Sequence, residues 1–373
     1  MQYLRAEFER PDLREGSRLP TVRELAVRLQ VSVYTVQSVF QKLSREGRIR
    51  TEVGNGTFLL ARPHKQSGNF QIALSIPSIK AGSAGLWTHG ISGGILQEAS
   101  RLRPRINLRP LSRQTADAET TERELMTERS EVDGLILFSS PFNDRVRRVY
   151  ENSGKPVVDL NPPSDTATAN FVSPDYFGAS YQLGKAWKQT GRRHVVLLLH
   201  APLEQSVSNR LRFSGLVNGL RLAADEPVFC RTVLSSSAGE EDGYQTVQGL
   251  LAGKHEVVDA VYCASDHLAL GAVRALREHG LRVPEDVSVV GGTGLNLSDA
   301  LCPELTSTQQ PLEDMGTNLI SMLCDRIKQD GSPIPGRILP TPFTGGGTTR
   351  PQENEILTVH STEKEQNLEM ELQ

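Results

Sequence analysis

The sequence predicts an α/β protein with an N-terminal winged helix-turn-helix, followed by a two-lobed doubly wound domain. Helix and hairpin signals fill the first sixty residues, and short apolar runs then alternate with amphipathic stretches of helix length. The chain of 373 residues is also too long for one compact core. We expect a first domain at 1–62, a linker at 63–69, a two-lobed domain at 70–350 and an acidic, flexible tail at 351–373.

The N-terminal segment carries the signals of helices joined by a tight turn. After a short amphipathic helix, Thr21 and Glu24 form a capping box for a helix that ends near Gln30. Ser32 can cap the next helix, whose apolar residues recur at helical spacing. A hairpin follows, because Val53-Gly54-Asn55-Gly56 places an Asn-Gly turn signal between two short alternating runs.

This arrangement favours binding to duplex DNA. Residues 1–65 carry 12 Lys and Arg against 7 Asp and Glu, whereas the remainder carries 29 against 37 in a chain of net charge −3. The second helix of the motif enters the major groove, where polar side chains reach base edges. A winged helix that binds another protein is the alternative. The expected reading residues are Ser32, Tyr34, Thr35, Gln37 and Ser38.

The head resembles a known family of DNA-binding domains. The stretch SRLPTVRELAVRLQVSVYTVQSVFQKLSREGRIRTEVGNGTFL resembles the gluconate-repressor (GntR) family, and the resemblance spans residues 1–60. It implies DNA contacts by Arg23, Thr35, Gly54 and Asn55. Val33 and Gln37 stand where many members carry arginines, so the operator sequence does not carry over.

Beyond the polar linker the hydrophobic pattern changes to that of parallel α/β sheets. Apolar runs alternate with amphipathic stretches over about 280 residues, which suits two doubly wound lobes with a ligand site between them. The expected strands are 70–76, 106–111, 134–138, 156–160, 194–199, 227–234 and 259–263.

Three segments of this region resemble the effector domain of the lactose/galactose-repressor (LacI) family, itself similar to periplasmic sugar-binding proteins. They are VSPDYFGASYQLGKAWKQTGRRHVVLLLH, SNRLRFSGLVNGL and residues 259–316, within a resemblance that spans about residues 70–350. Joined to the GntR-like head, this body resembles the arabinose-repressor group of bacterial regulators. The resemblance implies a ligand-responsive repressor of a carbohydrate-related operon that binds a palindromic operator as a dimer. An activator and a small-molecule receptor with a vestigial head are the alternatives.

The same resemblance implies a set of effector-binding residues. Arg212 matches the family's arginine that reaches the effector, and Arg210 lies beside it. Ser265 and Asp266 match an Asn-Asp pair of the family, and Trp87 falls where the family places an aromatic that stacks on the ligand. The alternatives are a helix cap for Asp266 and a core or lobe-interface position for Trp87.

The run VSVVGGTGLNLSD, residues 287–299, raises the question of a phosphate-binding loop. A dinucleotide site needs GxGxxG after the first strand and an acid about 20 residues further on. GGTGLN lacks the third glycine and comes late in the order of strands. We interpret it as an altered effector loop, in which Thr293 stands where the LacI family has its first acid. The departures at Ser265 and Thr293 argue against the family's usual monosaccharide.

Signatures of catalysis and of metal binding are missing from the sequence. HExxH and P-loop patterns do not occur, and the four cysteines lack CxxC spacing. The chain shows no secretory signal, and none of its apolar runs approaches the ~18 residues of a membrane span. We therefore expect no enzymatic activity, cofactor, metal or membrane partner. The expected setting is the cytoplasm, with operator DNA, a small effector and a second copy as partners.

Overall fold

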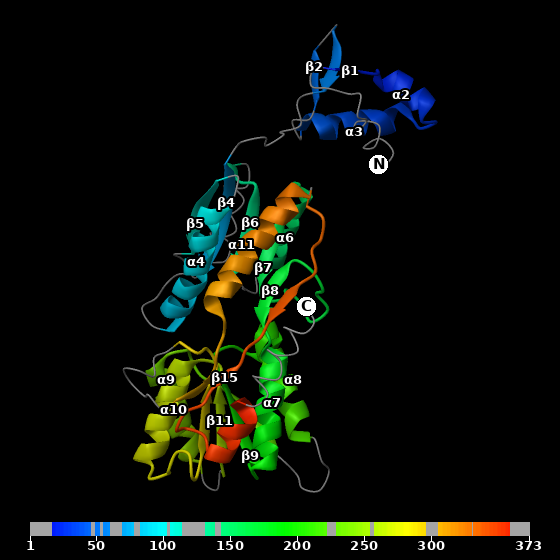
Figure 1. The fold of residues 1–373 in the computed structure, drawn as a ribbon. Helices are drawn as coiled ribbons and strands as arrows, with labels where there is room; N and C mark the ends of the chain where they lie inside the picture. Colours follow the sequence, from blue (N-terminus) through cyan, green and yellow to red (C-terminus); the bar gives the residue numbers. More distant parts are fainter. Residues whose placement is uncertain are drawn as a thin grey trace, which may run out of the picture. The chain divides into compact units, whose positions relative to one another are not determined.

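The polypeptide divides into two units, residues 1–68 and 69–373, each with its own hydrophobic core. Figure 1 shows the computed structural model coloured along the chain. The structure describes residues 17–45, 49–52, 55–59, 69–77, 83–102, 105–113, 131–138, 143–221, 229–253, 257–295, 305–329 and 331–358. The amphipathic helix expected first, residues 63–68 of the expected linker and Gly54 lie outside these ranges.

The first unit is the expected winged helix-turn-helix. Its described elements are β1 (Arg18–Leu19), α2 (Val22–Arg28), α3 (Val33–Arg45), β2 (Ile49–Glu52) and β3 (Gly56–Leu59). The sheet has the order β1-β3-β2, and β2 and β3 form the antiparallel hairpin. The capping box is present, because the Thr21 hydroxyl accepts from the Glu24 N–H at 3.2 Å and the Glu24 carboxylate accepts from the Thr21 N–H at 2.7 Å.

The second unit contains two six-stranded sheets in its described residues, one in each lobe. The first sheet has the order β14-β8-β7-β6-β4-β5, and all its neighbouring strands are parallel. Its strands are β4 (Phe70–Pro77), β5 (Ile106–Arg113), β6 (Gly134–Phe138), β7 (Val157–Leu160), β8 (Phe171–Pro174) and β14 (Arg337–Leu339). The predicted strand at 134–138 matches β6 at both ends.

The second sheet has the order β10-β9-β11-β12-β13-β15, and β15 is its antiparallel edge strand. Its strands are β9 (His194–Leu199), β10 (Phe229–Leu234), β11 (Ala260–Cys263), β12 (Ser288–Gly291), β13 (Thr306–Thr308) and β15 (Phe343–Thr344). The predicted strand at 194–199 matches β9 at both ends. Two parallel sheets of this kind confirm the predicted fold class.

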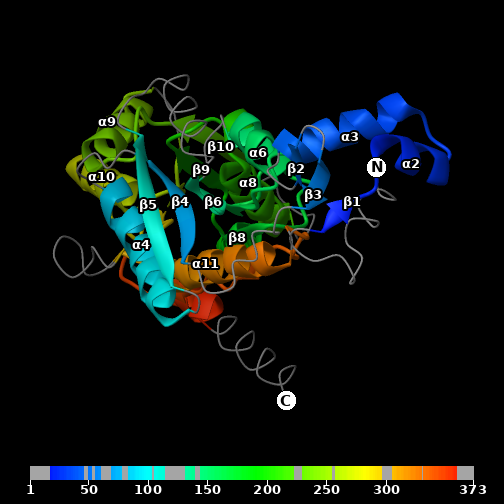
Figure 2. The same cartoon turned by 90° about the horizontal axis from the view of Figure 1, so that it is seen from above.

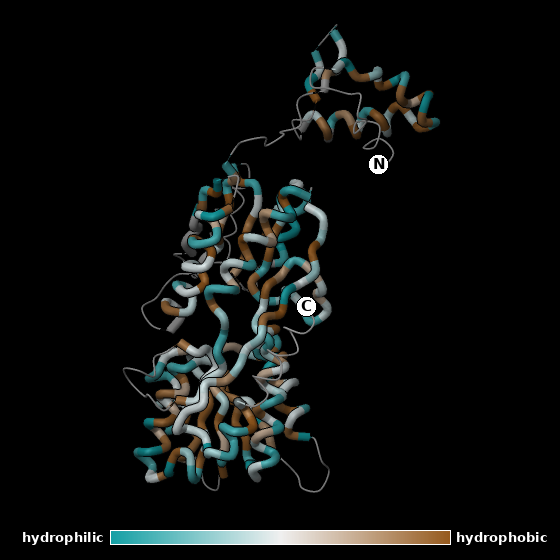
Figure 3. Tube along the Cα trace, viewed as in Figure 1, coloured by the Kyte–Doolittle hydropathy of each residue, from teal (hydrophilic) through white to brown (hydrophobic). Residues whose placement is uncertain are grey.

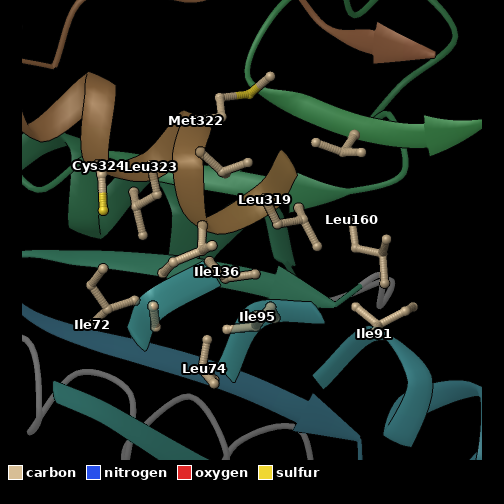
Figure 4. Packing of buried hydrophobic residues seen from close by; sticks show 14 of the residues in the cluster. Ile72, Leu74, Ile91, Ile95, Ile136, Leu160, Leu319, Met322, Leu323 and Cys324 are labelled. Carbon is tan, nitrogen blue, oxygen red and sulfur yellow. The ribbon is translucent and has the colours of Figure 1, made fainter. Parts of the chain in front are cut away.

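Helices cover both faces of the first sheet. Helices α4 (Ser83–Arg101) and α11 (Leu312–Lys328) pack together on one face, and α6 (Asn143–Asn152) packs on the other. The strands supply alternating residues to the two faces, so that Leu74 points into the α4–α11 cluster and Ala73 into the α6 cluster. Figures 1 and 2 show α4 and α11 beside this sheet, and Figure 4 shows the side chains packed between them.

The second sheet is covered in the same way. Helices α7 (Tyr176–Gln189) and α8 (Val207–Arg221) pack together against one face, and α9 (Glu240–Leu251) and α10 (Asp266–Glu278) pack against the other. In Figure 3 hydrophobic segments run through the strands of both lobes, as expected for parallel strands buried on both faces. No helix in the described ranges is long and apolar enough to span a membrane.

Three chain segments connect the two lobes. They are residues 174–176 between β8 and α7, residues 309–312 between β13 and α11, and residues 339–343 between β14 and β15. The Asp175 N–H donates to the Leu339 carbonyl at 2.9 Å, and the Gln309 N–H donates to the Pro342 carbonyl at 2.7 Å. The three crossings are therefore hydrogen-bonded to one another and form the junction between the lobes.

The expectation of a flexible tail from residue 351 is wrong for its first part. Residues 351–358 form a helix in which Glu353 and Leu357 are buried in the second lobe. The Glu353 carboxylate accepts from the Arg192 Nε at 2.9 Å and from the Ser288 hydroxyl at 2.6 Å. An acid-rich composition suggested solvent exposure, whereas one of these acids neutralises a buried arginine. Residues 359–373 lie outside the described ranges.

The change Glu353→Ala should lower the free energy of unfolding by about 3–5 kcal/mol, because it leaves the Arg192 guanidinium buried without its carboxylate. Urea unfolding followed by circular dichroism measures this loss. Glu355→Ala, at an exposed position of the same helix, should stay within about 0.5 kcal/mol of the wild type. Equal midpoints for the two variants would show that this helix does not belong to the folded lobe.

Candidate functional site

The exposed face at the start of α3 carries most of the predicted DNA-reading residues. Tyr34 is 81% exposed, and Gln37 and Ser38 are exposed as well. Ser32 caps the helix, because its hydroxyl accepts from the Thr35 N–H at 3.0 Å, and the two hydroxyls lie 2.7 Å apart in a hydrogen bond. The Tyr34 phenol, the Gln37 amide and the Ser38 hydroxyl take no part in this cap and are exposed on the same face.

The other predicted DNA contacts lie on different elements of the head. Arg23 is exposed on α2. Asn55 is exposed in the hairpin turn, where its N–H and its side-chain amide both donate to Glu52, at 3.0 and 3.2 Å. Gly56 follows with a φ of +114°, a backbone conformation that favours glycine. The hairpin is thus fixed by its own turn residues.

In the second unit, Arg212 lies buried on α8 and faces neutral groups. It is 4% exposed, and its Nη1 donates to the Asn209 Oδ1 at 3.2 Å. Its Nη2 donates to the Gly292 carbonyl at 3.4 Å, and the Tyr176 ring centroid lies 4.2 Å from its Cζ. A cation over an aromatic face gains about 2 kcal/mol in a desolvated setting. The Nε atom has no hydrogen-bond partner.

The glycine-rich loop after β12 is held by a protein carboxylate. The Asp266 Oδ1 accepts from the Thr293 N–H at 3.0 Å and from the Ser307 hydroxyl at 2.6 Å, and its Oδ2 accepts from the Leu295 N–H at 2.7 Å. The Thr293 hydroxyl in turn accepts from the Asp266 N–H at 3.2 Å. Backbone amides that could cradle a phosphate are thus bonded to Asp266.

Glycine is required in this loop by close packing and by backbone conformation. A Cβ at Gly292 would lie 2.4 Å from the Cys263 carbonyl oxygen, and Gly294 has a φ of +64°. The run of glycines therefore serves the packing of the loop against the end of β11. This finding agrees with the interpretation that the loop is not a nucleotide-binding fingerprint.

Ser265 and Asp266 have different roles from those weighed in the sequence. Ser265 caps α10, since its hydroxyl accepts from the Leu268 N–H at 3.2 Å and donates to the Ala238 carbonyl at 3.0 Å. The alternative of Asp266 as the cap is wrong, because its carboxylate faces the loop instead. Both side chains are buried and fully engaged within the protein. Contact with an effector by either residue stays a prediction.

Trp87 lies at the junction of the two lobes. Its ring packs edge-on against Phe138, with 6.4 Å between centroids, and its Nε1–H donates to the Gln310 Oε1 at 2.9 Å. The Gln310 Nε2 donates to the Gly292 carbonyl at 2.6 Å. This orientation of the Gln310 amide is the one that satisfies both partners, because an indole N–H only donates and a carbonyl only accepts. A hydrogen-bonded chain therefore runs from α4 of the first lobe to the loop of the second.

Arg210 lies two residues from Arg212 but has its own partners. Its Nε is within 3.0 Å of both carboxylate oxygens of Asp165, and its Nη1 donates to the Leu203 carbonyl at 2.6 Å. Asp165 precedes β8 in the first lobe, so this ion pair joins the lobes near the surface. The structure gives Arg210 a bridging position rather than a share in the surroundings of Arg212.

Several polar residues near Arg212 were not singled out in the sequence. They are Tyr176, Asn209, Gln310 and His200. Surrounding protein atoms and the Arg212 charge lower the pKa of His200 to about 4, although the residue as a whole is exposed. His200 is therefore neutral at pH 7 and offers one donor and one acceptor nitrogen. Its position at the end of β9 is the signal that could have revealed it.

Comparison with known proteins identifies both units. Residues 1–59 match the model of the bacterial regulatory proteins of the gntR family, and residues 185–349 match the periplasmic binding protein-like domain. These matches define a DNA-binding head joined to a ligand-binding type of domain. The chain thus resembles a GntR-type head joined to a periplasmic binding protein-like domain, and the LacI-family likeness predicted from the sequence agrees with these matches.

The curated relatives are regulators of transcription. The HTH-type transcriptional regulator CelR of Thermobifida fusca is 32% identical over 200 residues, which cover 52% of this chain and 57% of that protein. The HTH-type transcriptional repressor PurR of Yersinia pestis bv. Antiqua is 29% identical over 205 residues, which cover 54% and 59%. The chain thus spans less than two thirds of the length of these relatives.

Solved structures show the same fold. An uncharacterized protein from Actinobacillus succinogenes aligns with a TM-score of 0.65 and 25% identity, over 76% of this chain and 100% of that chain. The lac repressor dimer bound to operator and the anti-inducer ONPF aligns with a TM-score of 0.63 and 23% identity, over 78% and 99%. Both support the two-lobed architecture of residues 69–358.

The change Asp266→Asn should lower the free energy of unfolding by about 2–3 kcal/mol. The amide NH₂ of asparagine would face the Leu295 N–H, so a hydrogen bond to a charged acceptor is lost and two donors are opposed. Urea unfolding monitored by circular dichroism tests this. Asp314→Asn, at an exposed position of α11, serves as the control and should keep the wild-type midpoint. An Asp266→Asn midpoint equal to that of the control would contradict the holding role of this carboxylate.

Proposed function

We propose that this protein is a ligand-responsive transcriptional regulator that binds a palindromic operator as a dimer and represses a carbohydrate-related operon. The observation that carries the proposal is the combination of an exposed polar face on α3 with a two-lobed domain whose buried Arg212 has no carboxylate partner among the described residues. The first feature suits contact with base edges, and the second suits a small polar ligand. The cytoplasm is the compartment that fits this function.

The comparisons support the proposal without defining the partners. CelR, PurR and the lac repressor are transcriptional regulators rather than enzymes. A LacI family regulator from Enterococcus faecium, solved with bound ribose, shares the fold with a TM-score of 0.61 at 21% identity. These relatives make operator DNA and a small sugar-like effector the first partners to test, with a homodimer as the expected assembly.

The lobe junction offers a route for the effector to act. A ligand beside Arg212 would contact the network that links Trp87, Gln310 and Gly292, which joins elements of both lobes. The three crossing segments allow the lobes to change their relative orientation when that network rearranges. A coupling of about 1–3 kcal/mol between effector and operator would change DNA affinity 5- to 150-fold.

Selection of genomic fragments with the purified full-length chain tests the DNA-binding part. The recovered duplex is then titrated at two salt concentrations, because phosphate contacts make affinity fall as salt rises. A recovered palindrome, bound in preference to random duplex, is the expected result. Recovery of nothing above random, with weak and purely salt-driven binding, would contradict a reading head and favour a small-molecule receptor.

The double change Tyr34→Ala and Gln37→Ala should reduce the preference for the recovered duplex over random duplex about 30-fold or more, since two lost base contacts cost about 1–3 kcal/mol each. Binding to random duplex should change little, because phosphate contacts dominate it. Fluorescence anisotropy with both duplexes measures the ratio. Ser44→Ala, at an exposed position near the end of α3, is the matched control. An unchanged ratio in the double variant would exclude this face as the reader.

A further inference from the structure

Within the part of the chain that the structure describes, Arg212 is a buried cation without an anionic partner. It is 4% exposed, and its polar and ring contacts are Asn209, the Gly292 carbonyl and Tyr176, all of which are neutral. Buried arginines are usually paired with a carboxylate, because an uncompensated charge is costly inside a protein. The second lobe follows this rule at Arg192, which is paired with Glu353. Arg212 departs from it.

The neighbouring acids already have other partners. Asp266 accepts from two loop amides and the Ser307 hydroxyl. Asp175 accepts from the Gly178 N–H at 2.8 Å as the cap of α7, and Asp165 holds Arg210. In the described part of the second unit these carboxylates are thus engaged away from Arg212. Among the described residues no carboxylate is bonded to Arg212, so its positive charge is available to the anion of a ligand.

In Arg212, the Nε–Nη2 edge of the guanidinium, which usually binds a carboxylate, makes few hydrogen bonds. The Arg147 Nε and Nη2 donate to the two Asp159 oxygens at 2.9 and 2.6 Å, and Arg282 holds Asp286 through the same two nitrogens. In Arg212 the Nε has no partner, and the Nη2 has one carbonyl at 3.4 Å. This edge matches two oxygens of a carboxylate or a phosphate.

The surroundings are otherwise polar and neutral. His200, an exposed residue that follows the end of β9, has its pKa lowered first by surrounding protein atoms and then by the Arg212 charge. Asn209 and Gln310 carry amide groups that can exchange hydrogen bonds with hydroxyls, and Trp87 offers an aromatic ring. Hydroxyl groups of a ligand could replace protein partners of these amides, whereas among the groups named here the charge without an opposite partner is that of Arg212.

We propose that the effector is a small polyhydroxylated anion whose carboxylate or phosphate binds the Nε–Nη2 edge of Arg212. The assignment deepens the proposed function and rests on it in one respect, namely that an effector binds between the strand ends of the two lobes. It goes further by naming the charge of the ligand and the atoms that receive it. The Nε atom is enclosed, so the anion reaches it when the lobes or the loop at Gly292 move apart.

The test compares matched anions and neutral parents at constant ionic strength and without DNA. Ribose, ribonate and ribose 5-phosphate form one set, glucose, glucuronate and glucose 6-phosphate form a second, and inorganic phosphate is the simplest probe. Thermal unfolding screens them, and calorimetric titration measures affinity. At least one organic anion should bind tenfold or more tightly than its neutral parent and raise the melting temperature in a saturable way. Comparison of the sugar acids with the sugar phosphates then shows whether the site prefers a carboxylate or a phosphate.

Variants locate the binding. Arg212→Gln should abolish the shift produced by the anion, and Arg212→Lys, which keeps the charge but lacks the fork, should weaken carboxylate binding at least tenfold. Arg274→Gln is the matched control, because Arg274 also lies over a ring, that of Tyr244 at 4.0 Å, but is exposed and paired with acids. It should keep wild-type affinity. If Arg212→Gln fails to fold, the lysine variant alone decides the question.

Three results would overturn the proposal. They are a neutral parent that binds as tightly as its anion, the absence of a saturable shift with every anion tested, and undiminished anion affinity in the Arg212 variants. Failure of the proposed function is separate. An operator recovered together with binding of neutral sugars alone defeats only the charge assignment. Anion binding at Arg212 without any preferred duplex defeats only the regulator.

Discussion

The buried carboxylate of Asp266 is the group on which the loop beside Arg212 depends. It accepts hydrogen bonds from the Thr293 and Leu295 N–H groups and from the Ser307 hydroxyl, and these bonds fix the loop after β12. The fixed loop presents the Gly292 carbonyl to the rest of the site. A glycine-rich turn at the end of a parallel strand is well suited to bind an anion, and here the anion belongs to the protein. The loop is thus a scaffold for neighbouring groups.

From the Gly292 carbonyl, hydrogen bonds reach both lobes. Gln310 lies in a crossing segment and joins this carbonyl to Trp87 of the first lobe, while Arg212 approaches the same oxygen from α8. Two donors on one carbonyl make it a common point for the lobe junction and for the proposed ligand site. A ligand that displaces Arg212 from the Gly292 carbonyl would therefore alter the hydrogen bond of Gln310 to that carbonyl. Gln310 also bonds to Trp87, so the contact between the lobes would change as well.

Local sequence patterns predicted the head and the long strands well. The capping box at Thr21 and the strands at 134–138 and 194–199 lie where the residues placed them. The short strands β13, β14 and β15 escaped prediction, because each has two or three residues and gains its stability from neighbours distant in sequence. The helix at 351–358 was not predicted either, because its acidic composition suggests a solvated segment, whereas contacts of Glu353 with the distant Arg192 and Ser288 hold it in place.

By itself, the sequence determined the order of elements, the basic head and the candidate residues, because periodicity, capping and turn chemistry act within a few neighbours along the chain. The partners of those candidates were decided only by the tertiary structure. Asp266 is bonded to a loop about thirty residues away, and Arg212 shares the carbonyl of Gly292 with Gln310 from a third segment. Hydrogen bonds between such distant segments depend on the packing of two sheets, which no local pattern records.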